Sequence, residues 1–271
     1  KQKTAYEIVS RDWSSDVCSS DLVMRYELVR EKENVRAGVT NFSRVRTPLT
    51  IEVLERTKAG YRLAWTTGRS TVEEPKQLDE SQKRLLNIAD GLKLVVRTDA
   101  SGSPEELLNR VEVAASYQKV LGEIRANLAA GGLAADKIAQ ATAPVEALTQ
   151  PERVPALALK EPNIFFLMTG GSFVPGQPRD YDDELPNPLT GRPITTRARM
   201  LLKEVRREAG EAVLDWTQTP KAPDASLKLS DRATHTLDLR TGWPKSVRFE
   251  RVVEAGNSRR VERVEFNTPK P

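Results

Sequence analysis

Residues 44–66, RVRTPLTIEVLERTKAGYRLAWT, decide the fold that this sequence predicts. Apolar side chains alternate with polar or charged ones both before and after the turn Lys58-Ala59-Gly60. A period of two around a glycine-containing turn is typical of an antiparallel hairpin with one buried face. Pro48 has no N–H for a ladder hydrogen bond, so we expect it at a sheet edge or at a bulge.

A second stretch, residues 196–217, repeats this pattern as TRARMLLKEVRREAGEAVLDWT. Both stretches contain a long strand, a turn that ends in Ala-Gly, and a strand that ends in Trp-Thr, at Trp65 and Trp216. Farther along, the turns Gly102-Ser103-Pro104 and Gly242-Trp243-Pro244 also correspond. Two landmarks in the same order indicate duplication of a β-rich unit. The alternative is that unrelated hairpins share these features.

The segment between the two β-rich parts has the pattern of helices. Apolar residues from Leu107 to Leu128 step by three and four, which predicts an amphipathic helix. Pro104 suits the first turn of that helix. Residues 133–148 and about 151–166 predict further helices, and a short helix is expected at 78–89.

We therefore predict an α+β fold that forms a single domain over residues 23–271. Two antiparallel β units, residues 23–103 and 169–271, are expected to pack on a central helical segment, residues 104–168. The proposed duplication relates the two units.

Residues 1–22 are left out of this prediction, because they resemble a translated DNA primer. Residues 1–7 and 12–22 each match a translated block of the indexed adapter primer used for sequencing libraries. The two blocks share one reading frame and are separated by a gap of barcode length. We interpret residues 1–22 as a non-native, adapter-derived segment and expect the natural N-terminus, with any targeting signal, to lie elsewhere.

Excluding this segment changes the composition in two ways. The formal net charge rises from +4 to +5, because residues 1–22 contain three basic and four acidic side chains. Cys18 is the only cysteine, so the rest of the chain has none for disulfides, thiolate catalysis or metal binding. A mild, widely spread positive charge favours solubility more than binding of nucleic acid.

Few residues suggest catalysis or metal binding. His235 is the single histidine and shares a strand face with Leu237 and Leu239, so we expect it to be buried and structural. One histidine without cysteine provides no set of nitrogen and sulfur ligands for zinc. The acidic residues 180–184 lack the spacing and central glycine of a calcium loop, and we interpret them as a solvated loop.

The C-terminal hairpin is rich in alternating charges. Mixed signs on neighbouring positions predict the wet face of a sheet with cross-strand pairs rather than a surface that follows phosphates. No apolar run is long enough to cross a bilayer as a helix. We therefore predict no nucleic-acid partner and no transmembrane segment. The charged residues are Arg248, Glu250, Arg251, Glu254, Arg259, Arg260, Glu262, Arg263 and Glu265.

The order of elements, a long-stranded β unit, a helical interruption and a second β unit with Gly-x-Pro turns, resembles uncharacterised exported bacterial proteins. It resembles more distantly the periplasmic lipoprotein-carrier superfamily, whose members curve an antiparallel sheet around helices and hold an apolar chain in the concavity. No signature motif of that superfamily is present, so no binding residues can be assigned from it. The resemblance implies a ligand site between sheet and helices, with Tyr26, Trp65, Tyr117 and Trp216 as candidate ligand-binding residues.

We therefore expect a non-enzymatic bacterial envelope protein, periplasmic or secreted, that binds an apolar small molecule or lipid. No catalytic residue, metal ligand or cofactor is assigned. Two alternatives stay open. A structural module, or one that binds another envelope protein, predicts a filled core and an exposed apolar patch. A hydrolase with an unrecognised carboxylate site predicts carboxylates that converge with His235 in a cleft.

Overall fold

The computed structural model describes residues 22–75, 90–188, 190–222 and 226–269. The first strands are β1 (Val23–Arg36), β2 (Val39–Thr57), β3 (Gly60–Thr67), β4 (Thr71–Glu74), β5 (Lys93–Thr98) and β6 (Pro104–Leu107). The helices are α2 (Arg110–Ala130), α3 (Ala135–Leu148), α4 (Val154–Ala158) and α5 (Lys160–Phe165). The last strands are β7 (Arg179–Pro186), β8 (Pro193–Arg206), β9 (Glu211–Pro220), β10 (Lys228–Asp238), β11 (Pro244–Ala255) and β12 (Ser258–Asn267). The helix predicted at 78–89 lies outside the described residues.

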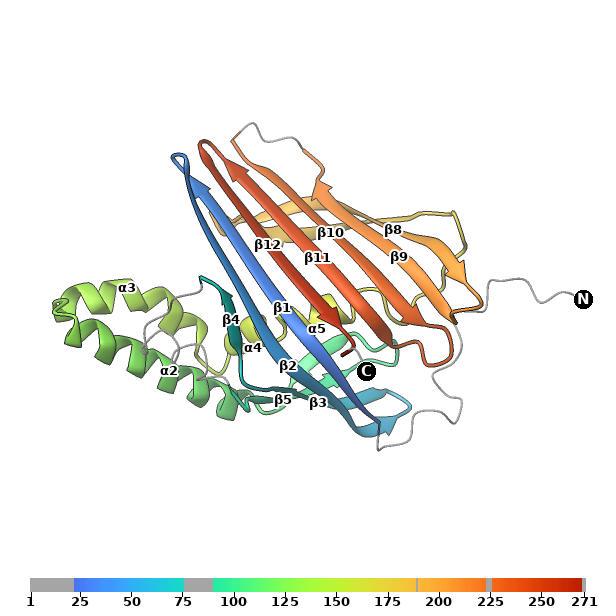
Figure 1. Cartoon of the computed structure of the whole chain (residues 1–271), viewed down its shortest axis with the longest axis horizontal. Coiled ribbons are helices and arrows are strands. Elements are labelled where there is room, and N and C mark those ends of the chain that lie inside the picture. The colour runs from blue at the N-terminus through green and yellow to red at the C-terminus, as the bar shows by residue number, and fades with distance from the viewer. Residues whose placement is uncertain (1–21, 76–89, 189, 223–225, 270–271) are drawn as a thin grey trace, which may run out of the picture.

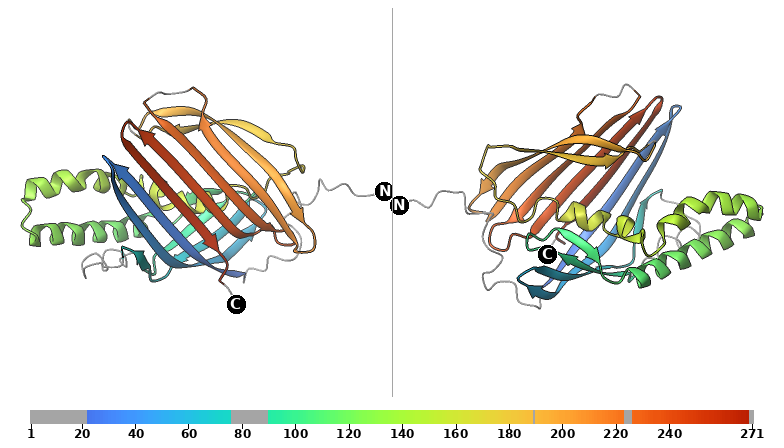
Figure 2. Two further views of the ribbon diagram at one scale, coloured as in Figure 1. Left: turned by 45° about the horizontal axis from the view of Figure 1, so that its top comes forward. Right: turned by 180° about the vertical axis from the view of Figure 1, so that it is seen from behind.

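The described strands form one antiparallel sheet of 12 strands, which curls into a half-barrel (Figure 1). The strand order is β6-β5-β3-β2-β1-β12-β11-β10-β9-β8-β7, and β4 pairs with β2 beside β3. Helices α4 and α5 lie on the concave side, while α2 and α3 form a hairpin that projects from one side (Figure 2).

The prediction of an α+β fold with two β units on a central helical segment is wrong. Strand β1 pairs with β12 from Glu27↔Asn267 to Arg36↔Ser258, and this pairing joins the two predicted units into one mostly β structure. The described helices do not form a layer between two units. Alternation in the sequence identifies strands with one buried face, but it does not specify that the first strand pairs with the last.

The predicted start of the long helix is also wrong. Residues 104–107 form β6, in which Leu107 pairs with Val96, and the helix begins only at Arg110. Along α2 only Val113, Ala114 and Leu121 are buried. The three-and-four spacing of apolar residues correctly predicted a helix. Most of that helix nevertheless faces solvent, because the α2–α3 hairpin projects away from the sheet.

Two pairs of hairpins in the sheet share the same irregularities. The β2–β3 register shifts two residues beyond the pair Ile51↔Trp65, and the β8–β9 register shifts two residues beyond Met200↔Trp216. The β5–β6 and β10–β11 registers each shift next to the proline of the Gly-x-Pro turn. In both turns an aspartate begins the loop: the N–H of Asp99 donates to Ser103 O at 3.0 Å, and that of Asp238 to Trp243 O at 2.9 Å. The corresponding hairpins thus share their geometry within a single sheet.

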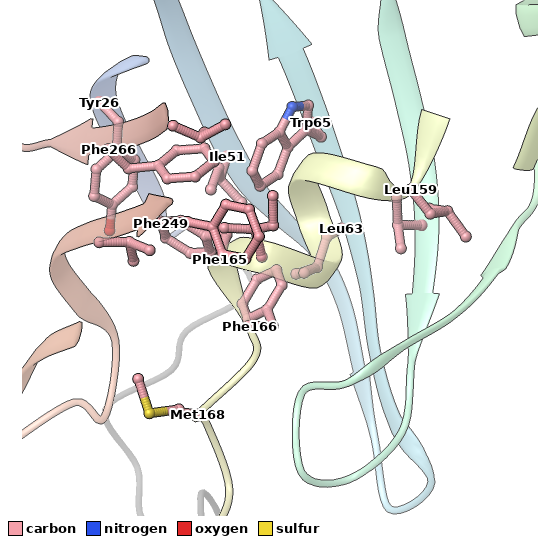
Figure 3. Close-up of a cluster of buried hydrophobic side chains, with 14 of the residues drawn as sticks. Tyr26, Ile51, Leu63, Trp65, Leu159, Phe165, Phe166, Met168, Phe249 and Phe266 are labelled. Carbon is pink, nitrogen blue, oxygen red and sulfur yellow. The ribbon is translucent and has the colours of Figure 1, made fainter. Parts of the chain in front are cut away.

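Aromatic side chains from helix and sheet form the centre of the core (Figure 3). Phe165 of α5 is fully buried, and its ring lies 5.0 Å from that of Tyr26, 5.6 Å from that of Trp65 and 5.2 Å from that of Phe266. These edge-on contacts fix α5 against the concave face. The strap α4–α5 therefore fills the middle of the half-barrel, and a cavity lies on each of its flanks.

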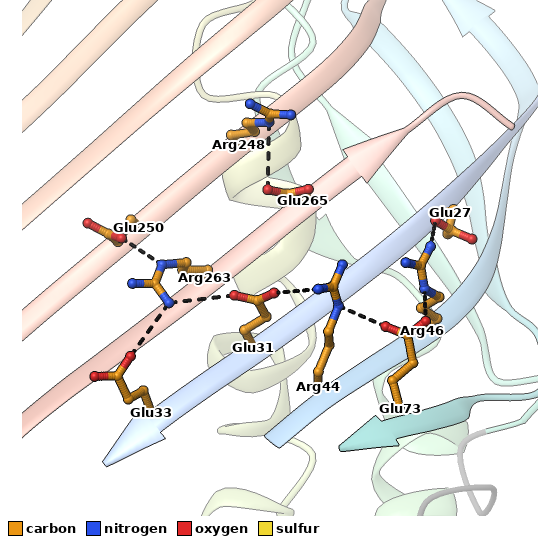
Figure 4. Close-up of polar contacts among 10 residues, drawn as sticks. All are labelled: Glu27, Glu31, Glu33, Arg44, Arg46, Glu73, Arg248, Glu250, Arg263 and Glu265. Atoms are coloured by element: carbon orange, nitrogen blue, oxygen red, sulfur yellow. Dashed lines mark hydrogen bonds and ion pairs between the residues drawn. The ribbon is translucent and has the colours of Figure 1, made fainter. Parts of the chain in front are cut away.

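The convex face carries a ladder of ion pairs (Figure 4). Arg44 lies 2.8 Å from Glu73 and 3.3 Å from Glu31, and Arg263 lies 3.5 Å from Glu31 and 2.7 Å from Glu250. Each partly exposed pair contributes little to stability by itself. The pairs Arg263–Glu250 and Arg248–Glu265 in this ladder agree with the cross-strand pairs that the sequence predicts for the C-terminal hairpin.

Candidate functional site

A cavity of about 540 Å³ lies on the concave side, between strands β1 to β5 and the helices α2 and α4. On β2, β3 and β5 its walls come from alternate residues, because side chains two apart share one face of a sheet, and β12 and α5 complete the wall. The apolar part of the lining is Val45, Trp65, Val72, Leu92, Leu94, Leu157, Ala158 and Val264. We call this space the first cavity.

The first cavity has one polar wall, formed where α5 meets β1. Arg30 donates from Nε and Nη2 to the two carboxylate oxygens of Glu161, the second bond being 2.8 Å long. Its Nη1 donates to Thr47 Oγ1 at 2.9 Å, and Thr47 Oγ1 lies 2.8 Å from Ser70 Oγ. Burial by itself lowers the pKa of Arg30. The hydrogen bonds to Glu161 and its negative charge outweigh this effect and raise the pKa above its usual value, so the ion pair stays charged.

A second ion pair ties the start of α5 to the other side of β1. Lys160 Nζ donates to Glu262 Oε2 at 2.9 Å, and Arg260 donates to the other oxygen of the same carboxylate. Burial alone raises the pKa of Glu262, whereas the bond from Lys160 and the charges of Lys160 and Arg260 lower it to about 2. Adjacent residues Lys160 and Glu161 thus fasten the strap to strands β12 and β1.

A second cavity of about 450 Å³ lies on the opposite flank of the strap, against β7 to β11. Asp231 is buried and accepts two bonds from Arg251, at 2.8 and 2.6 Å. Gln218 is also buried and donates to Thr196 Oγ1 at 2.7 Å. These buried polar groups already have partners within the protein.

The four candidate ligand-binding residues do not share one cavity. Trp65 and Tyr117 line the first cavity, and burial raises the pKa of the Tyr117 hydroxyl. Trp216 lines the second cavity, where its Nε1 donates to Tyr181 Oη at 3.0 Å. Tyr26 lies in the core between them, and its hydroxyl donates to Pro244 O at 2.7 Å.

Sequence reasoning missed the polar wall. Arg30 follows Tyr26 and Leu28 at the same strand parity, and this inward-facing arginine was the available signal. The C-terminal hairpin was interpreted as one wet face, but its charges divide between two faces. Arg251 and Glu262 pair with partners on the concave side rather than in the convex ladder.

His235 is fully buried, which confirms the inward orientation predicted from the sequence. Neither ring nitrogen has a hydrogen-bond partner among the residues that the structure describes. Burial lowers the pKa of His235 to about 3, so the ring is neutral near pH 7. It lines neither of the two cavities, and the carboxylates of Glu161, Glu262 and Asp231 beside the strap are paired with arginine or lysine.

The acidic residues 180–184 form part of the edge strand β7, not a loop. Asp180 pairs with Arg199 at 2.8 Å, and Asp182 pairs with Arg197 at 3.1 Å and Lys221 at 2.8 Å. Within the described ranges, no group of three or more His, Cys, Asp or Glu side chains is placed to hold a metal ion. None of the helices in the described part of the chain is long and apolar enough to cross a bilayer.

The chain matches no protein-family model, and a search of curated proteins found no significant relative.

Proposed function

We propose that this chain is a non-enzymatic bacterial envelope protein, periplasmic or secreted, that binds an apolar small molecule or lipid in the first cavity. The observation that carries the proposal is the cavity itself, about 540 Å³ in size, whose wall exposes more apolar than polar surface. Ligand pockets are typically concave and mostly apolar, with a few fixed polar groups that orient the ligand. The Arg30–Glu161 pair supplies such a group.

The position of the cavity gives physical support. Phe165 fills the centre of the half-barrel, so the core does not need the space on its flank for packing. Apolar walls that remain exposed to water are a cost to the free protein, and a ligand that covers them recovers roughly 25 cal/mol for each Å² removed from water. The curved antiparallel sheet around helices is also what the lipoprotein-carrier resemblance implies. The envelope location rests on that resemblance.

Binding is tested with N-phenylnaphthylamine, a neutral dye that fluoresces in apolar surroundings. We expect saturable fluorescence with the full chain. Leu157→Asp replaces an apolar side chain of the cavity wall by a charged one and should weaken dye binding about tenfold, which corresponds to about 1.4 kcal/mol of binding free energy. Leu148→Asp is the matched control: Leu157 is 39% and Leu148 45% exposed, but Leu148 lines neither cavity.

Two results would contradict the proposal. One is the absence of saturable dye binding by the unmodified chain. The other is equal weakening by Leu157→Asp and Leu148→Asp, which would place the dye on the helical hairpin rather than in the cavity.

An interaction module remains the second candidate, and a specific observation favours it. The α2–α3 hairpin projects from the sheet and leaves Val111 65%, Val145 45% and Leu148 45% exposed. Exposed apolar groups on one element are typical of contact surfaces. If a second copy is the partner, sedimentation equilibrium should show a dimer that Val145→Lys with Leu148→Lys dissociates. A concentration-independent monomer would exclude this self-association.

A further inference from the structure

We propose that the ligand of the first cavity is an anionic amphiphile: one negatively charged head group on an apolar chain. The head would contact a cationic rim, which we define as Lys32, Lys160 and Arg260. The chain would lie against Trp65 and Val264. This inference rests on the proposed function and specifies the ligand class for the same site.

The charge around the first cavity is unequal. Four cationic residues line the cavity, Arg30, Lys32, Lys160 and Arg263, against four acidic ones, Glu31, Glu74, Glu161 and Glu262. Arg260 lies outside the lining but pairs with Glu262, and it adds a fifth cation to the group. The excess is therefore one positive charge. Of these residues, Glu31 and Arg263 pair with each other in the convex ladder at 3.5 Å and cancel.

The rim residue that can offer its charge to a ligand is Lys32. It is exposed, lies directly across from Glu262 in the β1–β12 register, and has no ion pair with a described residue. Glu262 already accepts bonds from Lys160 and Arg260, so both of its oxygens are occupied. One added anion would balance the group, and charge-assisted hydrogen bonds to it are stronger than neutral ones.

Donors for an anion remain available at the rim. A lysine ammonium has three N–H groups, and Lys160 uses one on Glu262. Lys160 and Arg260 are 46% and 54% exposed, so their other N–H groups can reach a ligand. An anion at this position is solvated in part, which limits the desolvation cost that a fully buried charge would incur.

Along the strands, the rim residues and the apolar lining residues occupy successive positions on the concave face. Glu262 and Val264 are two residues apart on β12, and Ser43 and Val45 are two apart on β2, all on the concave face. Two residues of a strand span roughly 6.6 Å. At the next level, Val45 and Val264 lie on either side of Arg30, whose charge is already paired with Glu161, so they supply apolar surface directly after the rim. A molecule with one charged end and an apolar chain matches this order of surfaces.

The test compares three ligands with the same chain: dodecanoic acid, dodecyl phosphate and dodecanol, each displacing N-phenylnaphthylamine from the full-length chain. At least one of the two anionic compounds should displace the dye at about tenfold lower concentration than the alcohol. A stronger carboxylate identifies fatty acids as the source of the head group, and a stronger phosphate identifies phospholipid-like head groups.

Substitutions test whether the cationic rim causes the preference for an anionic ligand. Lys32→Gln with Arg260→Gln should reduce the advantage of the anion to about twofold or less and leave displacement by dodecanol unchanged. The matched control is Lys228→Gln with Arg248→Gln, an exposed lysine and arginine that line neither cavity. This control should keep the full advantage.

The outcomes separate the two proposals. If all three compounds displace the dye equally, or if both pairs of substitutions act alike, the anionic amphiphile is excluded while apolar binding stands. If the dye itself does not bind, the proposed function fails.

Discussion

His235 offers a test of how the core tolerates a titratable group. The ring is fully buried on β10, and neither nitrogen has a partner among the described residues. Replacing it by leucine removes two unpaired polar atoms and keeps an apolar side chain on the same strand face. We expect His235→Leu to fold and to change the dependence of stability on pH.

The sign follows from the pKa. Burial lowers the pKa of His235 from 6.5 to about 3. The unfolded chain therefore binds this proton at higher pH than the folded chain, and the free energy of unfolding falls as pH drops below 6.5, down to about 3. With these two values, linkage gives a loss of about 2 kcal/mol between pH 7 and pH 5. His235→Leu should lack this part of the loss.

The assay is urea denaturation of both proteins at pH 7 and pH 5, followed by tryptophan fluorescence. This window avoids the carboxylates: Glu262, with a pKa lowered from 4.5 to about 2, stabilises the fold above pH 4.5 and loses that contribution only below it. We expect the stability of the unmodified chain to drop by about 2 kcal/mol more than that of the variant. Equal drops would refute the reasoning and show that the folded protein accommodates a charged His235.

Four further predictions concern the core, one turn, helix α2 and the origin of the chain. Phe165→Ala should lower the free energy of unfolding by about 3 to 5 kcal/mol in urea denaturation, because it empties the centre of the aromatic cluster. Gly60→Ala should destabilise strongly in the same assay, since its φ is +149° and a Cβ would lie 2.0 Å from a backbone oxygen of β5. Gly122→Ala, with open space around it in α2, should instead stabilise by about 0.5 to 1 kcal/mol. Sequencing of the source DNA across the codons of Leu22 and Val23 should diverge from the primer-like sequence upstream of Val23, and a continuous genomic match would contradict the adapter interpretation.

The sequence predicted local structure well where the signal is local. The alternation in residues 44–66 identified β2, its turn and β3. Pro48 was expected at a sheet edge or a bulge, but it lies in the inner strand β2, between the part that pairs with β3 and the part that pairs with β4. The burial of His235 followed from strand parity. These features depend on residues that are close together in the sequence, so a single sequence is enough to predict them.

The sequence did not predict features that depend on distant pairing. The β1–β12 ladder decides that there is one sheet, and no local pattern encodes it. The first cavity has the same origin: Arg30 and Glu161 meet only because the strap crosses the concave face. Tyr26, Trp65, Tyr117 and Trp216 were chosen as aromatic residues near an expected concavity, but their division between two cavities depends on the position of α4 and α5.

The central claim is that the first cavity holds an apolar ligand. The most direct measurement is a crystal structure with a long-chain alcohol brominated at its far end, located by the anomalous signal of bromine. We predict one strong peak among Trp65, Val72 and Leu94 in the first cavity. A peak on the exposed face of the α2–α3 hairpin, or an empty cavity at saturating ligand, would contradict the account.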